Sequence, residues 1–266
     1  MNLADTDNTR SLNQFGFCFG EGGTHLARTM MLEDVTRVFE HCGDALTRDD
    51  VLEAVAEENC LGKPSKKSRA LAARHLLRLY GFDQKEAVFR AMTFLWDRDP
   101  ESRPQLAFLN AYSRDPMVRL GTPFLFDLED GEKYDRLLLE KFIESVSSER
   151  FSAATKTALA QRLAGTWTQS GHLEGKSKKL RRHVGAHPGS VVMALLLSYL
   201  SGHRGMLTFE SEYVKLLDCS PTSAIEIAKI AAQRGWMDIK HIGSVVEVAF
   251  PQILTDEEVE KIREQG

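Results

Sequence analysis

The sequence predicts a mainly α-helical protein, built of several helical modules with a small β-hairpin near its C-terminus. Along most of the chain, apolar residues recur at helical spacing between Ser or Asp at the start and Gly or Pro at the end. After Gly235 the spacing changes to that of short strands. We therefore expect helix-turn-helix and winged-helix-like modules, with the hairpin as the wing.

Four helices are expected in the first hundred residues. They span residues 24–42, 51–59, 65–80 and a stretch that runs from Asp83 through Phe94 to Trp96. Asp49 and Asp50 precede the second helix, and Asp83 is a candidate cap for the fourth. Ser65 is a suitable N-cap for the third helix, and Gly81 is a suitable stop.

Prolines at 100, 104, 116 and 123 predict short helices and turns in the next stretch. Further helices are expected at 135–145 and 152–171. The apolar run that contains Val191–Leu197 predicts a buried helix up to Leu200. Trp167 and Trp236 are expected in the core, because a large aromatic ring at a helical or strand position is usually buried.

The last 60 residues follow the order helix, turn, helix, hairpin. A short helix is expected at 213–217, and Ser220-Pro221 fits an N-cap followed by a first helical residue, with Ser223 and Glu226 as a capping box. The helix should end at Arg234-Gly235. Strands at 236–239 and 245–250, joined by a turn around Gly243, complete a winged-helix-like order.

We expect four parts along the chain. These are a disordered tail at 1–14, an N-terminal helix-turn-helix-like domain at 15–85, a middle helical domain at 86–185 and a C-terminal winged-helix-like domain at 190–266. Gly185–Gly189 is the expected linker to the last domain. Residues 152–183 show a weaker echo of the C-terminal pattern, a helix followed by a glycine-led apolar turn at 170–176.

The composition is that of an ordinary folded protein, with 42% hydrophobic and 27% charged residues and a net charge of −4. The longest apolar run falls far short of the roughly 20 residues that cross a bilayer. The N-terminal residues lack the apolar stretch of a signal peptide, and the four scattered cysteines form no Cys-x-x-Cys pair. A reduced, cytoplasmic protein without membrane contact is expected.

The motifs that would indicate catalysis are missing from the sequence. No phosphate-binding P-loop, nucleophile elbow or His-Glu-x-x-His zinc motif is present. Gly20-Glu21-Gly22-Gly23 precedes a helix and could hold a phosphate, but a tight turn is the alternative that we favour. The spacing of His183, His187 and His203 matches no metal-binding pair. We expect no catalytic residues, no metal and no cofactor.

A local basic segment stands out against the acidic whole. Between Asn59 and Phe82 the chain has no acidic residue and six basic ones: Lys63, Lys66, Lys67, Arg69, Arg74 and Arg78. At about 100° per residue, the cations at 67, 74 and 78 lie on one stripe of the expected helix, and the apolar residues at 73, 76, 77 and 80 lie on another. This pattern fits a helix that buries one face and binds phosphates with the other, or a solvated basic face with salt bridges.

A second basic cluster follows the helix expected at 152–171. It consists of Lys176, Lys178, Lys179, Arg181 and Arg182. Because phosphate contacts by Lys and Arg supply most of a protein's affinity for DNA, both clusters are candidate nucleic-acid-binding residues. The winged-helix-like module carries few cations, so it fits a DNA reader and a protein–protein module equally well.

Three motifs stand out in the N-terminal third: Phe17-Cys18-Phe19-Gly20-Glu21-Gly22-Gly23, Val55-Ala56-Glu57-Glu58-Asn59-Cys60-Leu61 and Ser65-Lys66-Lys67-Ser68-Arg69. With these motifs, this part of the chain resembles BrxA proteins of BREX phage-defence systems. The resemblance covers about residues 15–82. Over about residues 86–175, only the order of the helices matches. The tail from about residue 190 departs from that pattern, and a BrxA-like relative in another defence system fits equally well.

This resemblance implies a non-enzymatic, DNA-binding accessory protein of a bacterial phage-defence system. Its partners would be double-stranded DNA and other proteins of the same system. Lys66, Lys67 and Arg69 would contact phosphates, with Arg74 and Arg78 extending the contacts, whereas Gly22, Gly23 and Asn59 would be structural. Two alternatives remain open: a scaffold subunit that holds partner proteins, and a winged-helix transcriptional regulator. The sequence leaves the oligomeric state and any base specificity open.

Overall fold

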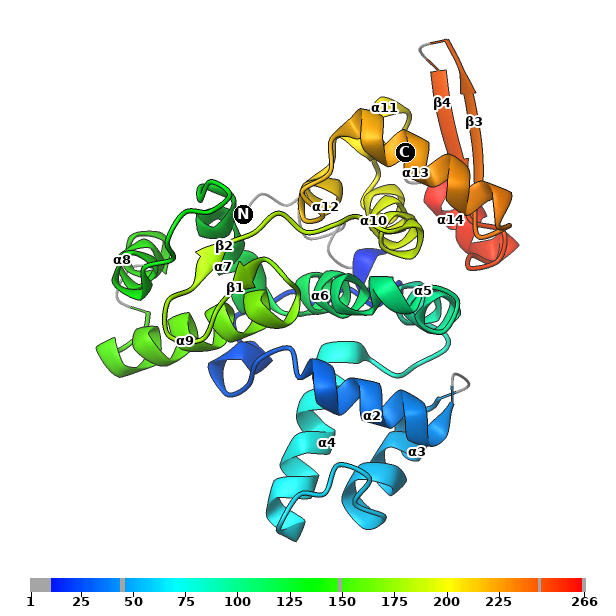
Figure 1. Ribbon diagram of the computed structural model, residues 1–266. Helices are drawn as coiled ribbons and strands as arrows, with labels where there is room; N and C mark the ends of the chain where they lie inside the picture. The colour runs from blue at the N-terminus through cyan, green and yellow to red at the C-terminus, as the bar shows by residue number, and fades with distance from the viewer. Residues whose placement is uncertain (1–10, 44–45, 148–149, 244, 265–266) are drawn as a thin grey trace. The chain divides into compact units, whose positions relative to one another are not determined.

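The computed structural model describes residues 11–43, 46–147, 150–243 and 245–264. Helices dominate this part of the chain, and its strands form two small antiparallel hairpins (Figure 1). The mainly α-helical class with a C-terminal hairpin is confirmed. Of the tail expected to be disordered, residues 1–10 lie outside the described residues, while residues 11–14 form a helical turn in which Leu12 is buried.

The chain divides into two compact units, and neither is continuous in sequence. Unit 1 comprises Met1–Phe17, Gln84–Leu109 and Gly185–Gly266, and unit 2 comprises Cys18–Asp83 and Asn110–Val184. Two of the changes between units fall close to the expected boundaries at 85 and 185. The segment expected to be a middle domain is instead shared between the units, because its first helices pack with the C-terminal segment.

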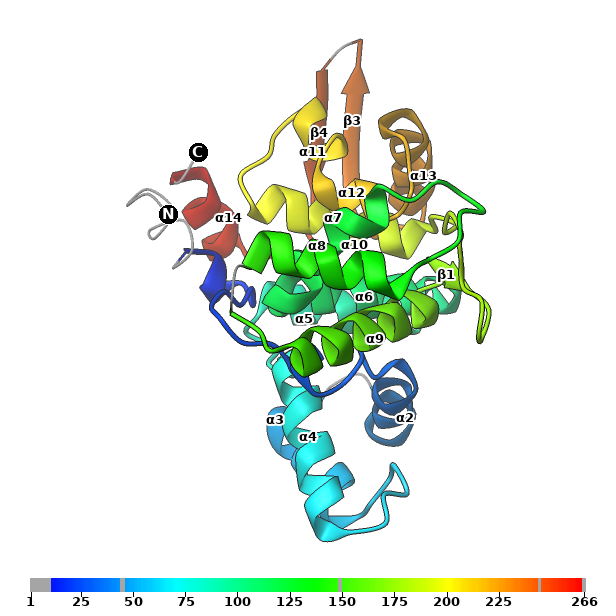
Figure 2. The same ribbon diagram turned by 90° about the vertical axis from the view of Figure 1, so that its left-hand side faces the viewer.

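The first half of unit 2 contains five helical elements. They are the 3-10 turn η1 (Thr24–Leu26), α2 (Leu32–Cys42), α3 (Arg48–Leu52), the π-helical turn η2 (Glu53–Glu57) and α4 (Lys66–Tyr80). α3, η2 and α4 pack against one another, and both views of the ribbon show α3 beside α4 (Figures 1 and 2). This part of unit 2 has the helix-turn-helix-like order expected from the sequence.

α4 has the ends that the sequence predicts. The Ser65 side chain accepts a hydrogen bond from the Ser68 N–H, and Gly81 follows the helix with a φ of 79°, a conformation that favours glycine. Ala73, Leu76, Leu77 and Tyr80 are buried, and the Tyr80 hydroxyl donates to the Met30 carbonyl. The apolar stripe therefore fixes α4 to the unit and leaves the opposite stripe to solvent.

The helix expected at 24–42 starts later than the sequence suggests. Thr24–Leu26 forms a separate turn, and α2 begins only after Met31, whose φ of 56° is left-handed. The Met30 N–H donates to the Thr166 hydroxyl at 2.9 Å. This contact with a distant helix interrupts what local spacing reads as one helix.

The second half of unit 2 packs three helices and a short hairpin. These are α7 (Pro116–Phe126), α8 (Arg136–Ser147), α9 (Ala153–Gln169), β1 (Leu173–Glu174) and β2 (Leu180–Arg181). α9 begins after the Ser152 cap and buries Trp167, as expected. Pro123 lies inside α7 and does not end it, so it is not the break that the sequence predicted.

The second basic cluster lies on a hairpin. β1 pairs with β2 in antiparallel register, Leu173 opposite Arg181 and Glu174 opposite Leu180. Residues 176–182 therefore form the turn and the second strand of this hairpin, so phosphate contacts from this cluster would not come from a helix. Gly175, with a φ of 106°, allows the chain to reverse directly after β1.

Unit 1 contains the winged-helix-like order. Its elements are α5 (Ala87–Trp96), η3 (Pro100–Ser102), the first part of α6 (Arg103–Arg114), α10 (Pro188–Leu200), α11 (Met206–Phe209), α12 (Glu212–Lys215), α13 (Pro221–Gln233), β3 (Asp238–Ile242), β4 (Val245–Ala249) and α14 (Asp256–Glu264). α10 is buried over nearly its whole length and packs against α5, α12 and α13. Trp236 is buried before the hairpin, in agreement with the sequence.

Unit 1 differs from expectation in several details, among them the first strand of the hairpin, which was expected at 236–239 and spans Asp238–Ile242. α5 begins after Glu86, so Asp83 is not its cap. Ser220 caps α13 by accepting from the Ser223 N–H, and this bond replaces the capping box expected between Ser223 and Glu226. The turn of the β3–β4 hairpin includes Ser244, which lies outside the described residues. Neither α11 nor α14 was expected from the sequence.

Candidate nucleic-acid interface

The eleven cations expected to bind nucleic acid differ in exposure. Six are exposed: Lys66, Lys67, Arg74, Arg78, Lys176 and Lys178. The other five are partly or fully buried: Lys63, Arg69, Lys179, Arg181 and Arg182. Burial matters because a phosphate of a DNA backbone reaches an exposed cation without displacing protein atoms.

Two cations of the first cluster are partly buried. Lys63 Nζ lies 2.8 Å from Asp34 Oδ1, and both side chains are partly buried. Arg69 is half-buried, with its Nε shielded from solvent. These two residues are therefore poorer candidates for phosphate contact than the other four cations on α4.

Three cations of the second cluster support the hairpin. Lys179 donates to the Thr168 hydroxyl at 2.6 Å, and burial lowers the pKa of its ammonium group. Arg182 forms an ion pair with Glu174 at 2.7 Å, and this hydrogen bond raises the pKa of its guanidinium. Arg181 is 1% exposed. Lys176 and Lys178 are left as the cations of this cluster that face solvent.

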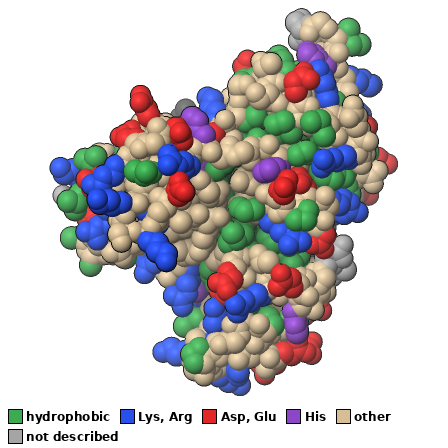
Figure 3. Space-filling view, in the orientation of Figure 1, with side chains coloured by type: hydrophobic (Ala, Val, Ile, Leu, Met, Phe, Trp, Pro, Cys, Tyr) green, Lys and Arg blue, Asp and Glu red, His purple; other side chains and the backbone are tan. Residues whose placement is uncertain are grey.

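The exposed side of α4 forms a cationic stripe. Lys67, Arg74 and Arg78 face away from the buried residues of the helix, and Lys66 lies beside them at its N-terminus. Within the described parts of the chain, no acidic side chain forms an ion pair with these four residues. Figure 3 shows Lys and Arg side chains along the outer edge of the α4 part of unit 2.

The stripe continues into a hollow that sequence reasoning missed. The hollow has a volume of about 500 Å³, and four arginines line it: Arg48, Arg74, Arg78 and Arg114. We call it the arginine hollow. Arg48 is the first residue of α3, and Arg114 is the last residue of α6. Both are far in sequence from the basic segment, so no local pattern identifies them.

Hydrogen bonds to backbone carbonyls hold two of these arginines. Arg48 Nη1 donates to the Gly81 carbonyl at 3.0 Å, and Arg114 Nε donates to the Arg78 carbonyl at 3.3 Å. Arg114 is 7% exposed. The side chains are therefore positioned before any ligand arrives, which lowers the entropy lost on binding.

The field around the hollow is positive. None of the residues that line it is acidic. Burial, followed by the charges of Arg28, Arg74 and Arg78, lowers the pKa of His75 on α4. Like charges gathered in this way are stabilised by a bound anion.

The glycine-rich entry serves packing. A methyl group on Gly22 would lie 3.1 Å from Arg78 Nη2, and one on Gly23 would lie 2.0 Å from Asp115 Oδ1. The His25 N–H, just after these glycines, already donates to Asp115 at 3.0 Å. The tight-turn interpretation of Gly20–Gly23 therefore fits better than a phosphate site.

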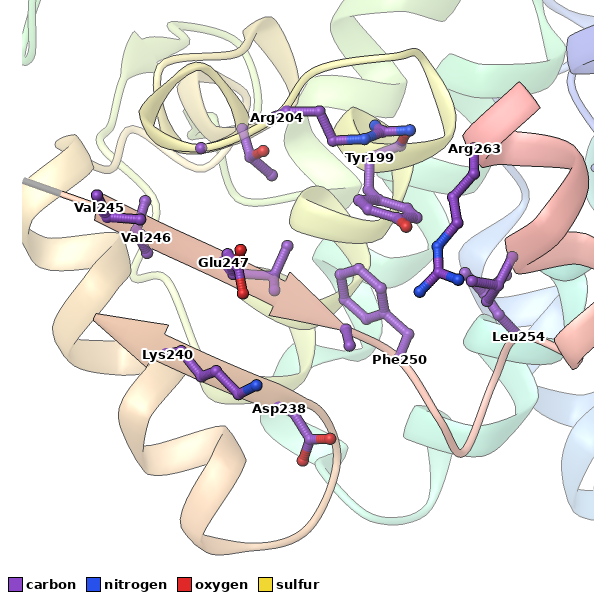
Figure 4. Close-up of a pocket in the computed structure, with 15 residues that line it drawn as sticks. Tyr199, Arg204, Asp238, Lys240, Val245, Val246, Glu247, Phe250, Leu254 and Arg263 are labelled. Atoms are coloured by element: carbon purple, nitrogen blue, oxygen red, sulfur yellow. The ribbon is translucent and has the colours of Figure 1, made fainter. Parts of the chain in front are cut away.

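A larger hollow of about 610 Å³ lies in unit 1, between the β3–β4 hairpin, α10 and α14 (Figure 4). Its charges are mixed, because Asp238 and Glu247 line it together with Arg204, Lys240 and Arg263. The Arg204 guanidinium stacks on the Tyr199 ring at 4.1 Å and donates to the Tyr199 carbonyl. This hollow is a weaker anion site than the arginine hollow.

A buried Asp–His–Thr arrangement resembles a catalytic triad in its contacts. His25 Nδ1 lies 2.9 Å from Asp115 Oδ2, and its Nε2 lies 2.7 Å from the Thr166 hydroxyl. All three side chains are shielded from solvent. Since no substrate can reach Thr166, we assign this arrangement to the stability of unit 2.

Two histidines of unit 1, His187 and His203, have separate partners. His187 lies 3.5 Å from Glu101, and His203 lies 3.2 Å from the Ser198 carbonyl. A search of the described residues finds no group of His, Cys, Asp or Glu side chains that could hold a metal ion. Among the same residues, every helix is too short or too polar to cross a membrane.

No protein-family model matches the chain, and comparisons with curated proteins and with solved structures also give no match. The resemblance to BrxA proteins therefore stays a prediction from the N-terminal motif. The function has to be argued from the exposed cations of unit 2 and the hollow beside them.

Proposed function

We propose that this protein binds DNA through α4 of unit 2, without catalysing a reaction. The observation that carries this proposal is the cationic stripe of Lys66, Lys67, Arg74 and Arg78, which faces solvent beside a hollow lined by arginines and no acid. Cations that are exposed and lack local ion pairs release counterions when they bind phosphates, and this release provides affinity.

The start of α4 supplies a second argument. Lys66 and Lys67 are its first two residues, and its first turn has no acidic residue. A helix N-terminus carries partial positive charge, so lysines at this end reduce helix stability. A bound phosphate removes that conflict, because it interacts favourably with the helix end and with both lysines. Lys176 and Lys178 extend the cationic surface of unit 2 in this proposal.

In this proposal α4 positions the protein on the DNA backbone and reads no bases. Phosphate contacts fix orientation and carry no sequence information. The N-terminal motif adds the biological setting: an accessory role in a bacterial phage-defence system, in the cytoplasm, beside other proteins of that system.

A fluorescence-anisotropy titration of labelled duplex DNA tests the proposal. We expect affinity that falls steeply between about 50 and 200 mM salt. A variant with Lys66, Lys67, Arg74 and Arg78 changed to Glu should lose this binding. The matched control changes four exposed lysines elsewhere to Glu, namely Lys133, Lys141, Lys215 and Lys261. Equal affinity of the two variants would contradict the assignment to α4.

A scaffold function is the second candidate, and the hairpin of unit 1 favours it. Ile242 and Val245, opposite each other at the hairpin tip, are 80% and 61% exposed. Large apolar side chains at such a tip are more typical of protein contacts than of phosphate contacts. If the scaffold function is correct, the protein should lack duplex affinity at physiological salt. It should instead co-purify stably with defence proteins encoded nearby, and Ile242→Ser should reduce the amount that co-purifies.

A further inference from the structure

The arginine hollow has an apolar floor. Leu52, Ala56, Ala70 and Leu77 line it between the four arginines. Leu52 is 42% exposed, a large apolar side chain left open to water. A ligand with a negative group and an apolar, flat body therefore matches the hollow better than a simple anion does.

The size and depth of the hollow limit the ligand. Its volume of about 500 Å³ is within the range of small-molecule sites, roughly 300–1,000 Å³, and is enough for a single nucleotide. In a duplex the bases are stacked and paired, so their faces cannot reach the floor. An unpaired nucleotide can place its phosphate between the arginines and its base against Leu52 or a guanidinium plane.

The hollow and the phosphate-binding stripe share residues. Arg74 and Arg78 belong to both, so a strand that leaves a duplex on α4 enters the hollow without crossing another surface. Arg48 of α3 extends the positive surface beyond the stripe, whereas Arg114 of α6 is 7% exposed and forms part of the wall of the hollow. This continuity favours nucleic acid as the occupant, because a nucleic acid can contact the cationic stripe and the hollow at once. An acidic peptide in the hollow would leave the stripe unused.

We infer that the arginine hollow binds an unpaired nucleotide, so that the protein prefers DNA with a single-stranded end to blunt duplex. This inference rests on the proposed function, because it gives the α4 site a more specific substrate. The preference arises from stacking and from the arginines of the hollow, and it is independent of base sequence.

The experiment compares three labelled probes at one salt concentration. They are a blunt DNA hairpin, the same hairpin with a single six-thymidine overhang, and a thymidine oligonucleotide. The overhang is tested once at the 5′ end and once at the 3′ end of the hairpin strand. We expect the overhang probe to bind about ten-fold more tightly than the blunt hairpin, as one base stacked on a guanidinium in the hollow would provide. The full-length protein is used throughout.

Two matched variants locate the effect. Ala70→Gln places a longer neutral side chain in the hollow on an exposed position of α4, so net charge is unchanged. Ala153→Gln makes the same substitution on an exposed position at the start of α9. The overhang preference should disappear in Ala70→Gln and persist in Ala153→Gln, with blunt-hairpin affinity close to wild type in both. Circular dichroism checks that both variants are folded. If Ala70→Gln does not fold, Arg48→Gln replaces it, and this variant should lower the affinity for the overhang probe.

The possible results separate the two proposals. Equal wild-type affinity for blunt and overhang probes overturns the inference and leaves DNA binding intact. A preference that survives Ala70→Gln shows that the unpaired strand binds elsewhere. Binding of no probe overturns both proposals. The unlabelled thymidine oligonucleotide and a polyglutamate peptide are also compared as competitors of the overhang probe. If the peptide displaces the probe equally well, the hollow binds acidic peptides instead.

Discussion

At the scale of single residues, burial decides which charged groups serve stability and which are available to a ligand. Asp115 is 2% exposed and accepts hydrogen bonds from the His25 ring, the His25 N–H and the Met117 N–H. Burial opposes ionisation of this carboxyl, but the hydrogen bond and charge of His25 outweigh it and hold the pKa of Asp115 below its usual value. A carboxylate with so many donors joins the N-terminal loop, α7 and α9 of unit 2.

Replacing Asp115 should destabilise unit 2. Asp115→Asn removes the negative charge that His25 faces and leaves an amide group against two N–H donors. We expect a loss of about 3 kcal/mol in the free energy of unfolding, at the lower end for breaking a buried pair. Urea denaturation measures it, with the exposed Asp49→Asn as the control. A change below about 0.5 kcal/mol, typical of surface substitutions, would show that the network is dispensable.

The same carboxyl gives a pH dependence with a defined sign. Because its folded pKa lies below the unfolded value of 3.8, its contribution is complete well above pH 3.8 and is lost as pH falls through the folded pKa. The free energy of unfolding of the wild type should therefore fall more steeply below about pH 4 than that of Asp115→Asn. Parallel curves for the two proteins would show that Asp115 has no depressed pKa.

At the scale of the element, α4 combines good helix ends with an unfavourable charge distribution. The Ser65 cap and the Gly81 stop support the helix, whereas Lys66 and Lys67 oppose its dipole. Residues retained against local stability are typical of functional sites. The conflict at this helix end gives a test that requires no knowledge of the ligand.

Charge reversal at the start of α4 should separate stability from binding. Lys66→Glu with Lys67→Glu places acids where the helix dipole favours them, so stability should rise by about 0.3–1 kcal/mol per residue. DNA affinity should fall at the same time. Thermal unfolding and anisotropy measure the two effects, with Lys133→Glu and Lys141→Glu as the control pair. Reduced stability together with unchanged affinity would contradict the role given to these lysines.

At the scale of the whole molecule, local positive charge is set against a net charge of −4. If the protein binds DNA as we propose, the acidic remainder opposes binding, and the exposed cations of α4 have to supply the affinity. Counterion release then makes the salt dependence a count of the phosphates bound.

Removing one cation should change that count by one. For Arg78→Gln, we expect the slope of log affinity against log salt to become shallower by about 0.9 on duplex DNA. Arg182→Gln, which breaks the ion pair with Glu174, should leave the slope unchanged. The reverse result would move the interface from α4 to the hairpin of unit 2.

Local sequence determined the helices whose ends are set by neighbouring residues. Ser65 and Gly81 cap the two ends of α4, Ser152 caps the start of α9, and Gly235 precedes the hairpin. Sequence predicts these ends because caps and left-handed glycines act within a few residues. The exposed cations of α4 followed from the same helical spacing. The sequence by itself thus determined the mainly α-helical class, the order α12, α13, β3, β4 in the C-terminal part and the stripe on α4.

Tertiary structure decided what depends on contacts between distant segments. The Met30–Thr166 contact delays the start of the helix expected at 24–42. Packing also joins Gln84–Leu109 with the C-terminal segment in unit 1. It buried Arg181, and it brought Arg48 and Arg114 to α4 to form the hollow. Spacing along a chain fixes the face of a helix on which a residue lies, but the packing of other elements fixes whether that face meets water, core or ligand.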